Sequence, residues 1–567
     1  MSKKFKKYIR VAAGTPSIKV ADPIHNSQEI LRLMKKAEDE DIQLLVLPEL
    51  CITGSTCGDL FLQDTLLQAA ENALNYLAKE SKNTLVVLGL PMRQNNNMVA
   101  VIYKRQILAC VPKTTSGEAT IFQCDDFTFA IDADKDASAT IIISLNASSE
   151  TVGKAAQRRT LAAAKSTQLA CGYIYANAGY GESTGDAVFS GHNMIYEMGK
   201  LLSESPPFGE GWTVSEIDVS AIDYKQRRIN KTANKEIVVP FTMEAACETL
   251  IRPISPSPFM PQNEKAARCE EILNIQAAGL KKRMEHTNSK KAVINVSGGL
   301  DSTLALLVTA RVTKEIEAIT MPCFGTTTRT RNNAHILCKE LGIPCREIDI
   351  VKSVTQHLED IDHKSTTDIV YENAQARMRT YVAMDIANQV DGLVIGTGSL
   401  SELALGYATY NGDHMSMYAL NSGIPKTTVR HIVEYLADKA PPALSAVLID
   451  ILDTPVSPEL LPNQITEELV GPYELHDFFI YHMLGHGKSP KQIYHLACLA
   501  FDKNPEVILK WLKVFYSRFF SQQYKRNCLP EGPRVGSINL SPRGSWHMPS
   551  DAINTIWMSE IKDIVSP

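Results

Sequence analysis

Residues 292–303, Ala-Val-Ile-Asn-Val-Ser-Gly-Gly-Leu-Asp-Ser-Thr, decide how the second half of the chain folds. Their apolar, β-branched start predicts a buried strand, and the Leu- and Ala-rich residues 304–308 predict a helix. Gly298 and Gly299 lie between the two. Glycines let a backbone turn sharply and come close to a ligand, so we expect a strand, a tight turn and a helix in succession.

The turn before this helix has the chemistry of a phosphate site. A helix N-terminus offers unpaired N–H groups and a positive dipole end to anions. Ser297, Ser302 and Thr303 add hydroxyl donors, and Asp301 adds a carboxylate that can hold a metal ion. The lysine of the G-x-x-x-x-G-K-[ST] loop is missing, so we expect the loop to hold pyrophosphate without it. The S-G-G-x-D-S pattern resembles the loop of the ATP-pyrophosphatases; the alternative is a glycine-rich turn without a ligand.

Length and composition limit the class of protein. The 567 residues exceed the ~250–300 at which one core stops growing, so we expect more than one domain. A net charge of -5 argues against a nucleic-acid partner held by bulk charge. No apolar run reaches the ~18 residues that span a bilayer, and no apolar signal segment follows the basic N-terminus. We therefore expect a cytoplasmic protein with no membrane partner.

Strand and helix patterns alternate over the first 240 residues or so. Predicted strands and helices follow one another at 8–13, 26–38, 42–49, 66–78, 84–90, 98–103, 140–145, 154–166 and 173–177. This alternation predicts an α/β layered domain. Residues 251–263 contain four prolines, which cannot continue a helix or a central strand. We therefore expect domains at 1–245 and 264–567, joined by a linker at 246–263.

Three segments of the first domain, 47–54, 111–114 and 144–154, resemble the nitrilase superfamily. The resemblance implies an αββα sandwich with a Glu–Lys–Cys triad, in which Glu49 is the base and Lys113 its partner. It also implies that Ser148 and Lys154 contact glutamine in members that act as glutaminases.

The nucleophile of this triad is missing from the sequence. Residues 129–136, Phe-Ala-Ile-Asp-Ala-Asp-Lys-Asp, match the family segment best and place Asp134 where the cysteine belongs. Glutaminase chemistry needs a thiolate that forms an acyl-enzyme, and a carboxylate replaces it poorly. We therefore expect a domain that has lost its glutaminase, with Glu49 and Lys113 left as an ion pair. The alternative is that Cys124 or Cys51 acts as the nucleophile.

The second domain alternates strands and helices around the phosphate loop. Strands are predicted at 292–296, 316–322, 346–350 and 393–402, with helices between them. This order predicts a doubly wound parallel sheet, whose ligands bind at the carboxyl ends of the strands. We also expect a helical C-terminal extension.

Six segments in collinear order (321–326, 347–350, 372–379, 396–407, 421–427 and 541–546) resemble the glutamine-dependent NAD+ synthetase family. The resemblance implies that ATP adenylates the carboxylate of deamido-NAD+ (nicotinic acid adenine dinucleotide), and that ammonia then gives NAD+ and AMP. It implies ATP contacts from Ser297, Gly298, Gly299, Asp301, Ser302, Thr397 and Lys426. It implies deamido-NAD+ contacts from Asn373, Glu402, Tyr407, Ala408, Thr409, Tyr410 and Lys525. Mg2+ is expected on Asp301 and Glu402.

Each assignment has a structural alternative. Asn373 fits a helix start, the i,i+3 spacing of Tyr407 and Tyr410 fits packing, and Lys525 fits a solvated basic turn. His476, His482 and His486 invite a zinc interpretation, but no cysteine or carboxylate spacing supports it.

Two questions of function stay open at this point. A tRNA-modifying ATP-pyrophosphatase would predict cysteine pairs and a basic face, and the 12 cysteines form no C-x-x-C pair. The first domain is expected to be a scaffold in a homo-oligomer that takes ammonia directly, and the alternative is a working glutaminase that uses glutamine.

Overall fold

The computed structural model describes residues 5–113, 120–132, 139–185, 187–229, 237–261, 264–457, 459–461 and 466–564. The chain divides into two compact units, Met1–Pro253 and Ile254–Pro567. Asp134, expected at the place of the missing nucleophile, lies outside the described residues. Among the described residues, no helix is both long and apolar enough to cross a membrane.

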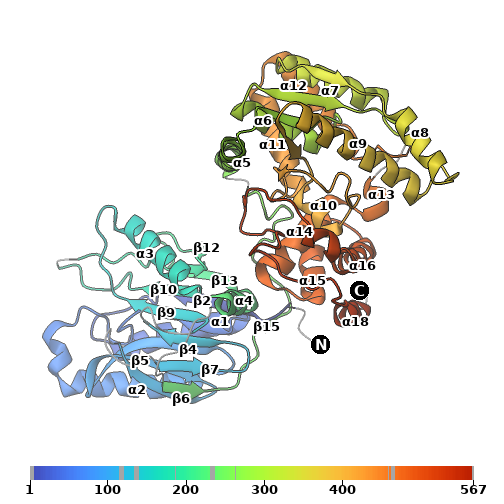
Figure 1. Ribbon diagram of the computed structural model, residues 1–567. Helices are drawn as coiled ribbons and strands as arrows, with labels where there is room; N and C mark the ends of the chain where they lie inside the picture. Colours follow the sequence, from blue (N-terminus) through green and yellow to red (C-terminus); the bar gives the residue numbers. More distant parts are fainter. Residues whose placement is uncertain are drawn as a thin grey trace. The chain divides into compact units, whose positions relative to one another are not determined.

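Two β-sheets form the centre of the first unit (Figure 1). The first sheet runs in the order β13 (Trp212–Asp218), β2 (Tyr8–Gly14), β3 (Leu44–Val46), β4 (Leu85–Met92), β5 (Asn95–Tyr103) and β6 (Gln106–Pro112). The second runs in the order β12 (Lys200–Glu204), β11 (Met194–Glu197), β10 (Gly172–Asn177), β9 (Ile141–Asn146), β8 (Thr128–Ile131), β7 (Thr120–Gln123) and β14 (Ile237–Pro240). Side chains of both sheets, such as Leu44 and Phe129, share one buried core.

Helices cover the two outer faces of these sheets. α1 (Pro23–Asp39) and α2 (Asp64–Glu80) pack on the first sheet, and α3 (Lys154–Leu169) packs on the second (Figure 1). α1 begins cleanly because Asp22 caps it by accepting the backbone N–H of His25, and Pro23 takes its first position. The helix–sheet–sheet–helix order confirms the expected αββα sandwich.

The chain after this sandwich remains attached to it for several residues. β15 (Ala246–Cys247) pairs antiparallel with β1 (Phe5–Lys6), after α4 (Val219–Arg228) and β14. Arg252 then donates hydrogen bonds to both carboxylate oxygens of Glu197, at 2.9 and 3.0 Å. The first residues of the expected linker are therefore held by the first unit.

A five-stranded parallel sheet forms the centre of the second unit. Its order is β18 (Cys345–Glu347), β17 (Ile316–Thr320), β16 (Lys291–Asn295), β19 (Gly392–Gly396) and β20 (Tyr418–Ala419). The strand order reverses at β16, because β17 and β19 lie on its two sides. Ligands bind in the crevice at such a switch point, at the carboxyl ends of the strands.

Helices cover both faces of this sheet, as a doubly wound fold requires. Ala292 and Ile294 face a core shared with α5 (Lys265–Thr287), α6 (Leu300–Val312), α7 (Thr328–Glu340), α11 (Lys426–Lys439) and α12 (Pro442–Leu452). Val293 faces the opposite core, beneath α8 (Val351–Asp360) and α9 (Ile369–Gln389). The alternation along one strand explains how β16 is buried on both sides.

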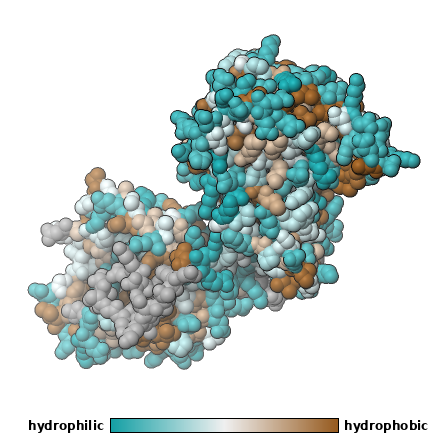
Figure 2. Space-filling model, viewed as in Figure 1, coloured by the Kyte–Doolittle hydropathy of each residue, from teal (hydrophilic) through white to brown (hydrophobic). Residues whose placement is uncertain are grey.

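The chain ends in a helical extension: α13 (Thr466–Val470), α14 (Tyr473–Ile480), α15 (Pro490–Ala500), α16 (Pro505–Ser521), α17 (Gln523–Asn527) and α18 (Thr555–Lys562). α14 contacts both α10 (Leu400–Leu405) and α11, so the extension packs directly on the elements that follow β19. Hydrophilic residues cover most of the visible face of the second unit (Figure 2).

Candidate active site

The turn between β16 and α6 has the backbone geometry that the sequence predicts. Gly298 has a φ of +83°, and a Cβ there would lie 2.0 Å from the backbone oxygen of Thr330. Only glycine fits, because the first turn of α7 packs directly on the loop. Gly299 is extended and begins α6, so the helix points its free N–H groups into the turn.

The serines of this turn hydrogen-bond within the loop. The hydroxyls of Ser297 and Ser302 lie 3.1 Å apart, and Ser302 donates to the backbone oxygen of Gly299 at 3.0 Å. Ser297 also accepts the N–H of Gly299 at 3.1 Å. An anion bound here would exchange these internal bonds for bonds to its own oxygens, at a helix N-terminus that favours negative charge.

Lys426, the first residue of α11, connects two carboxylates from different loops. Its Nζ donates to Oδ2 of Asp301 and, at 2.9 Å, to Oε1 of Glu402. All three side chains are largely buried, with 5%, 15% and 20% of their surfaces exposed respectively. The two carboxylates raise the pKa of Lys426 against the opposing effect of burial, so this group carries a positive charge beside the phosphate loop.

The two glycine turns are also held together. The side-chain amide of Asn421 donates to the backbone oxygen of Asp301 at 2.9 Å and to that of Thr397 at 3.0 Å. Thr397 directly follows β19, and Asp301 lies in α6 after β16. The fold thus brings together the expected ATP residues from three separate segments, at the carboxyl ends of neighbouring strands.

Asp301 and Glu402 differ in their capacity to bind a metal ion. Oδ1 of Asp301 is buried and has no hydrogen-bond partner among the described residues. Both oxygens of Glu402 already accept hydrogen bonds, from Lys426 and, at 2.9 Å, from the N–H of Ser399 at the start of α10. Asp301 therefore offers an available oxygen ligand, whereas Glu402 would have to give up a bond.

The expected deamido-NAD+ residues gather around the loop after α10. Thr409 donates to Oδ1 of Asn373 on α9 at 2.9 Å. Nζ of Lys525 donates to the backbone oxygens of Gly406 and Ala408 at 2.8 and 2.7 Å. Asn373, Ala408, Thr409 and Lys525 thus form one connected cluster.

The two tyrosines of this loop point to different neighbours. Tyr407 lies beneath the guanidinium of Arg518, 5.6 Å from the ring centroid, and burial raises the pKa of its hydroxyl. Tyr410 is 40% exposed and stacks on His414 with the ring centroids 5.2 Å apart. Tyr410 also contacts the ring of Tyr524, with the centroids 5.6 Å apart, so both tyrosines have packing partners and Tyr410 is partly exposed.

In the first unit, Glu49 and Lys113 meet as the sequence predicts. Nζ of Lys113 lies 2.5 Å from Oε2 of Glu49, and the amide of Asn97 donates to the other Glu49 oxygen at 2.6 Å. Both side chains are less than one-fifth exposed.

Asp132 completes this group. It directly follows β8, and its Oδ2 lies 3.9 Å from Nζ of Lys113. Its other oxygen, Oδ1, accepts a hydrogen bond from Ser144 at 2.6 Å. Burial raises the pKa of Asp132. Asp132 has a φ of +42°, a left-handed backbone conformation that is strained for residues other than glycine. Strained residues of this kind are often found in active-site turns.

Comparison with known protein families gives a match in each half of the chain. A family model described as NAD synthase matches residues 272–518, and one described as carbon-nitrogen hydrolase matches residues 10–117. A glutamine-dependent NAD(+) synthetase from Mycobacterium leprae is 34% identical, with 98% of this chain and 98% of the relative covered. This chain belongs to the glutamine-dependent NAD(+) synthetase family. The family catalyses the ATP-dependent amidation of deamido-NAD+, and its members are ligases.

One further relative and one solved structure are less similar in sequence to this chain. A glutamine-dependent NAD(+) synthetase from Thermotoga maritima is 27% identical over 96% of this chain and 98% of its own. A solved structure of a glutamine-dependent NAD(+) synthetase from Cytophaga hutchinsonii is 19% identical, with a TM-score of 0.47, 98% of this chain and 100% of that chain covered.

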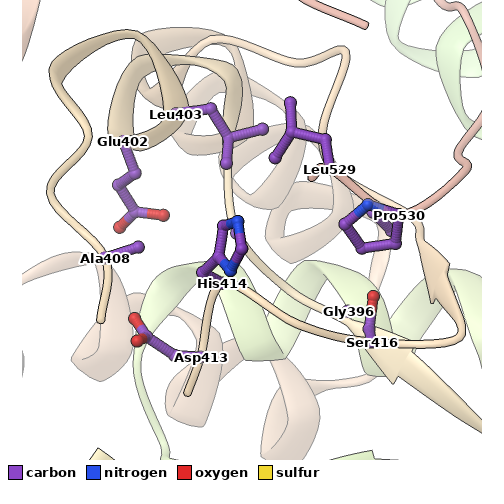
Figure 3. Close-up of a pocket in the computed structure, with 11 residues that line it drawn as sticks. Gly396, Glu402, Leu403, Ala408, Asp413, His414, Ser416, Leu529 and Pro530 are labelled. Atoms are coloured by element: carbon purple, nitrogen blue, oxygen red, sulfur yellow. The ribbon is translucent and has the colours of Figure 1, made fainter. Parts of the chain in front are cut away.

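In this NAD(+) synthetase family member, one pocket contains residues that the sequence did not single out. It is lined by Gly396, Gly398, Glu402, Leu403, Ala408, Asp413, His414, Ser416, Ala419, Leu529 and Pro530. The carboxylates of Glu402 and Asp413 lie on one side and Leu403, Leu529 and Pro530 on the other (Figure 3). Oδ1 of Asp413 accepts the N–H of Thr409 at 2.7 Å. The polar segment 411–414, directly after Tyr410, is the sequence signal that could have identified Asp413 and His414.

Cys124 and Cys51 are the two cysteines considered as substitutes for the missing nucleophile. Cys124 follows β7, which runs antiparallel to β8, so Cys124 lies beside the start of β8 and Asp132 follows its end. Burial raises the pKa of Cys51 to about 12, and its thiol donates to the backbone oxygen of Gly89. Burial also raises the pKa of Cys124, and a protonated thiol is a poor nucleophile.

The remaining expected contacts have local roles in the structure. Ser148 donates its backbone N–H to Asn177 at 2.8 Å, and Lys154 begins α3. Nε2 of His476 donates to the backbone oxygen of Val470 at 2.7 Å, and burial lowers the pKa of His476 to about 4. Within the described part of the chain, no three His, Cys, Asp or Glu residues form a group that could hold a metal ion.

Proposed function

We propose that this enzyme amidates deamido-NAD+ with ammonia taken directly from solution. The observation that carries the proposal is Asp132, a carboxylate beside Glu49 and Lys113 where the glutaminase reaction needs a thiolate. Asp132, rather than Asp134, is the residue that we assign to the nucleophile's place.

The chemistry of a carboxylate explains why we propose that the enzyme has lost its glutaminase activity. Attack of a thiolate on glutamine gives a thioester, which water hydrolyses readily. Attack of Asp132 would give an anhydride, which is higher in energy than the amide it came from, so ammonia would not be released. Burial also raises the pKa of Asp132 and so disfavours its ionised form.

The synthetase site fits the family reaction. The N-terminus of α6 and the hydroxyls of Ser297 and Ser302 are placed to bind the phosphates of ATP. Lys426 supplies a fixed positive charge that favours the charge developing on the phosphates as pyrophosphate leaves. Adenylation gives the substrate carboxylate a good leaving group, and ammonia then attacks the acyl carbon.

The donor set at the phosphate loop suits Mg2+. The available oxygen of Asp301 is a hard ligand, and Mg2+ commonly combines one or two carboxylates with substrate phosphates. Bound there, the ion would neutralise phosphate charge. We assign Asp301 as its main ligand and Glu402 as a secondary one.

The cluster of Asn373, Ala408, Thr409 and Lys525 is our proposed binding site for deamido-NAD+. Its backbone and amide groups are held in place by Lys525 and by the Thr409–Asn373 hydrogen bond. The exposed ring of Tyr410 offers a stacking surface for a planar base. The homo-oligomer and the cytoplasmic location expected from the sequence stay predictions.

The test is an assay of NAD+ formation with purified enzyme, ATP, Mg2+ and deamido-NAD+. We expect ammonium to support the reaction, and glutamine, freed of contaminating ammonia, to support neither NAD+ formation nor glutamate release. Glutamate release at the rate of NAD+ formation would overturn the proposal for the nitrogen source. Absence of NAD+ with either donor would overturn the synthetase reaction itself.

A further inference from the structure

Two thiols face each other at the edge of the parallel sheet, away from the phosphate loop. Cys338 lies near the end of α7, and Cys345 begins β18, the edge strand. Their side chains are within hydrogen-bonding distance of each other. Cys338 is fully buried, Cys345 is partly exposed, and both belong to the same apolar cluster. The inner thiol is thus protected from solvent, and the outer one is accessible.

Polar residues surround the outer thiol. His335, one turn before Cys338, hydrogen-bonds to Cys345 and has its Nε2 2.8 Å from Oε2 of Glu347. Arg331 pairs with the same glutamate. The hydrogen bond from Cys338 and the neighbouring His335 lower the pKa of Cys345, against burial and the charge of Glu347. Burial raises the pKa of Cys51, Cys110, Cys124 and Cys323 instead.

We propose that Cys345 and Cys338 form an oxidation site, in which a hydroperoxide converts the two thiols into a disulfide. A thiolate, unlike a thiol, attacks peroxides, and a second thiol in contact with it completes the reaction. The proposal is independent of the nitrogen source and of the synthetase reaction.

The reaction balances in two steps. The Cys345 thiolate attacks one oxygen of the hydroperoxide, the O–O bond breaks, and the other oxygen leaves as an alcohol or as water after it takes a proton. Cys345 is then a sulfenic acid. The sulfur of Cys338 attacks that of Cys345, the S–O bond breaks, and hydroxide leaves as water with the proton of Cys338. Two thiols are oxidised by two electrons, and one peroxide is reduced.

The sequence between the two cysteines makes the product easy to detect. Lys339 follows Cys338, and Arg346 follows Cys345. Trypsin therefore places the two cysteines in separate peptides, 332–339 and 340–346, which remain joined only if the disulfide exists. Full-length reduced enzyme is treated with hydrogen peroxide near one equivalent, its remaining thiols are alkylated, and the unreduced digest is analysed by mass spectrometry.

We expect the joined peptide from the wild-type enzyme and from Cys110→Ser, a control at another partly buried cysteine. Cys338→Ser should give no joined peptide and should carry a sulfenic acid on Cys345 that dimedone traps. Cys345→Ser should leave Cys338 unmodified, because the buried thiol has no thiolate partner. Alkylation of both peptides in treated wild-type enzyme, or dimedone labelling of Cys338 in Cys345→Ser, would overturn the proposal.

A second measurement does not depend on the digest. A disulfide limits the conformations of the unfolded chain and therefore stabilises the fold. The peroxide-treated wild-type enzyme should melt at a higher temperature than the reduced enzyme, and a thiol reductant should reverse the shift. Cys338→Ser should show no such reversible shift, and a shift of equal size in that variant would contradict the assignment.

Discussion

The carboxylate of Asp132 lies 3.9 Å from the ammonium group of Lys113. We assign Asp132 to the place that the cysteine takes in the Glu–Lys–Cys triad. Its Oδ2 is buried and accepts no hydrogen bond from the described part of the chain, while Ser144 holds Oδ1. The positive φ of Asp132 places this side chain on a sharp turn at the end of β8. Glu49, Lys113 and Ser144 therefore surround a carboxylate at the position that we assign to the nucleophile.

Asp132→Cys should create glutaminase activity. The new thiol would lie beside Lys113 and Glu49, which are placed to stabilise a thiolate and to move its proton. The measurement is glutamate release from glutamine in the absence of ATP. Asp132→Ser is the matched control and should show no gain, because a serine hydroxyl lacks the acidity of a thiol.

The same variant tests the role of Glu49. If Glu49 is the base, adding Glu49→Gln to Asp132→Cys should lower glutamate release by about 100-fold or more. Ammonium-dependent NAD+ formation should be unchanged in all three variants, which shows that they fold. A folded Asp132→Cys enzyme without glutamate release would count against our assignment of the nucleophile's place.

Lys426→Met should impair both stability and catalysis. It leaves Asp301 and Glu402 buried together without their cation, and losing one partner of a buried pair costs about 3–5 kcal/mol of unfolding free energy. We also expect kcat/KM for ATP to fall by about 100-fold or more. Lys439→Met, on the same helix with a side chain 58% exposed, should change the free energy of unfolding by less than about 0.5 kcal/mol. Equal effects of the two substitutions would contradict the role of Lys426.

Gly298→Ala should weaken ATP binding. The new Cβ would lie 2.0 Å from the Thr330 oxygen and would force a left-handed conformation on alanine. Such backbone strain alone costs about 1–3 kcal/mol, and the clash adds to it. Gly342→Ala is a matched control, because Gly342 also has a positive φ and no atom of the described residues lies within 4 Å of where its Cβ would be. Calorimetric titration with ATP should show a loss of affinity for Gly298→Ala only.

Asp477→Asn should flatten the pH dependence of stability. Burial raises the pKa of Asp477 from 3.8 to about 6, so the folded state binds more protons than the unfolded state between these values. The free energy of unfolding therefore falls as pH rises from about 4 to about 6, by roughly 2–3 kcal/mol from this group.

Chemical denaturation across this pH range measures the effect. The difference in unfolding free energy between wild type and Asp477→Asn should change over the window, whereas the exposed Asp438→Asn on α11 should track the wild type throughout. If the difference in unfolding free energy between wild type and Asp477→Asn stays constant with pH, this would contradict the raised pKa of the buried Asp477 carboxyl.

Local patterns predicted the glycine turn after β16 and the strand and helix on its two sides. The β-branched run, the glycines and the apolar periodicity at 292–308 each depend on neighbouring residues, so the sequence alone could indicate strand, turn and helix. The Lys426–Asp301 contact joins residues 125 positions apart, and no periodicity reports it. Nor could the sequence show that both oxygens of Glu402 already accept hydrogen bonds.

The assignment of Asp134 shows a different limit. Residues 132 and 134 are two positions apart, and side chains in a strand alternate with a period of two. Both therefore satisfy the same alternating pattern. The end of β8 at Ile131 puts Asp132 at the turn beside Lys113, whereas Asp134 lies outside the described residues. Strand ends are set by the pairing of β8 with β9, which a single sequence does not reveal.

The most direct test of the account is an isotope competition. The enzyme would be given ATP, Mg2+ and deamido-NAD+ with equal concentrations of heavy-isotope-labelled ammonium and unlabelled glutamine, and the amide nitrogen of NAD+ would be analysed by mass spectrometry. We expect the amide to carry the heavy isotope throughout, with no glutamate formed. An unlabelled amide, accompanied by an equal amount of glutamate, would contradict the claim that Asp132 has replaced a working nucleophile.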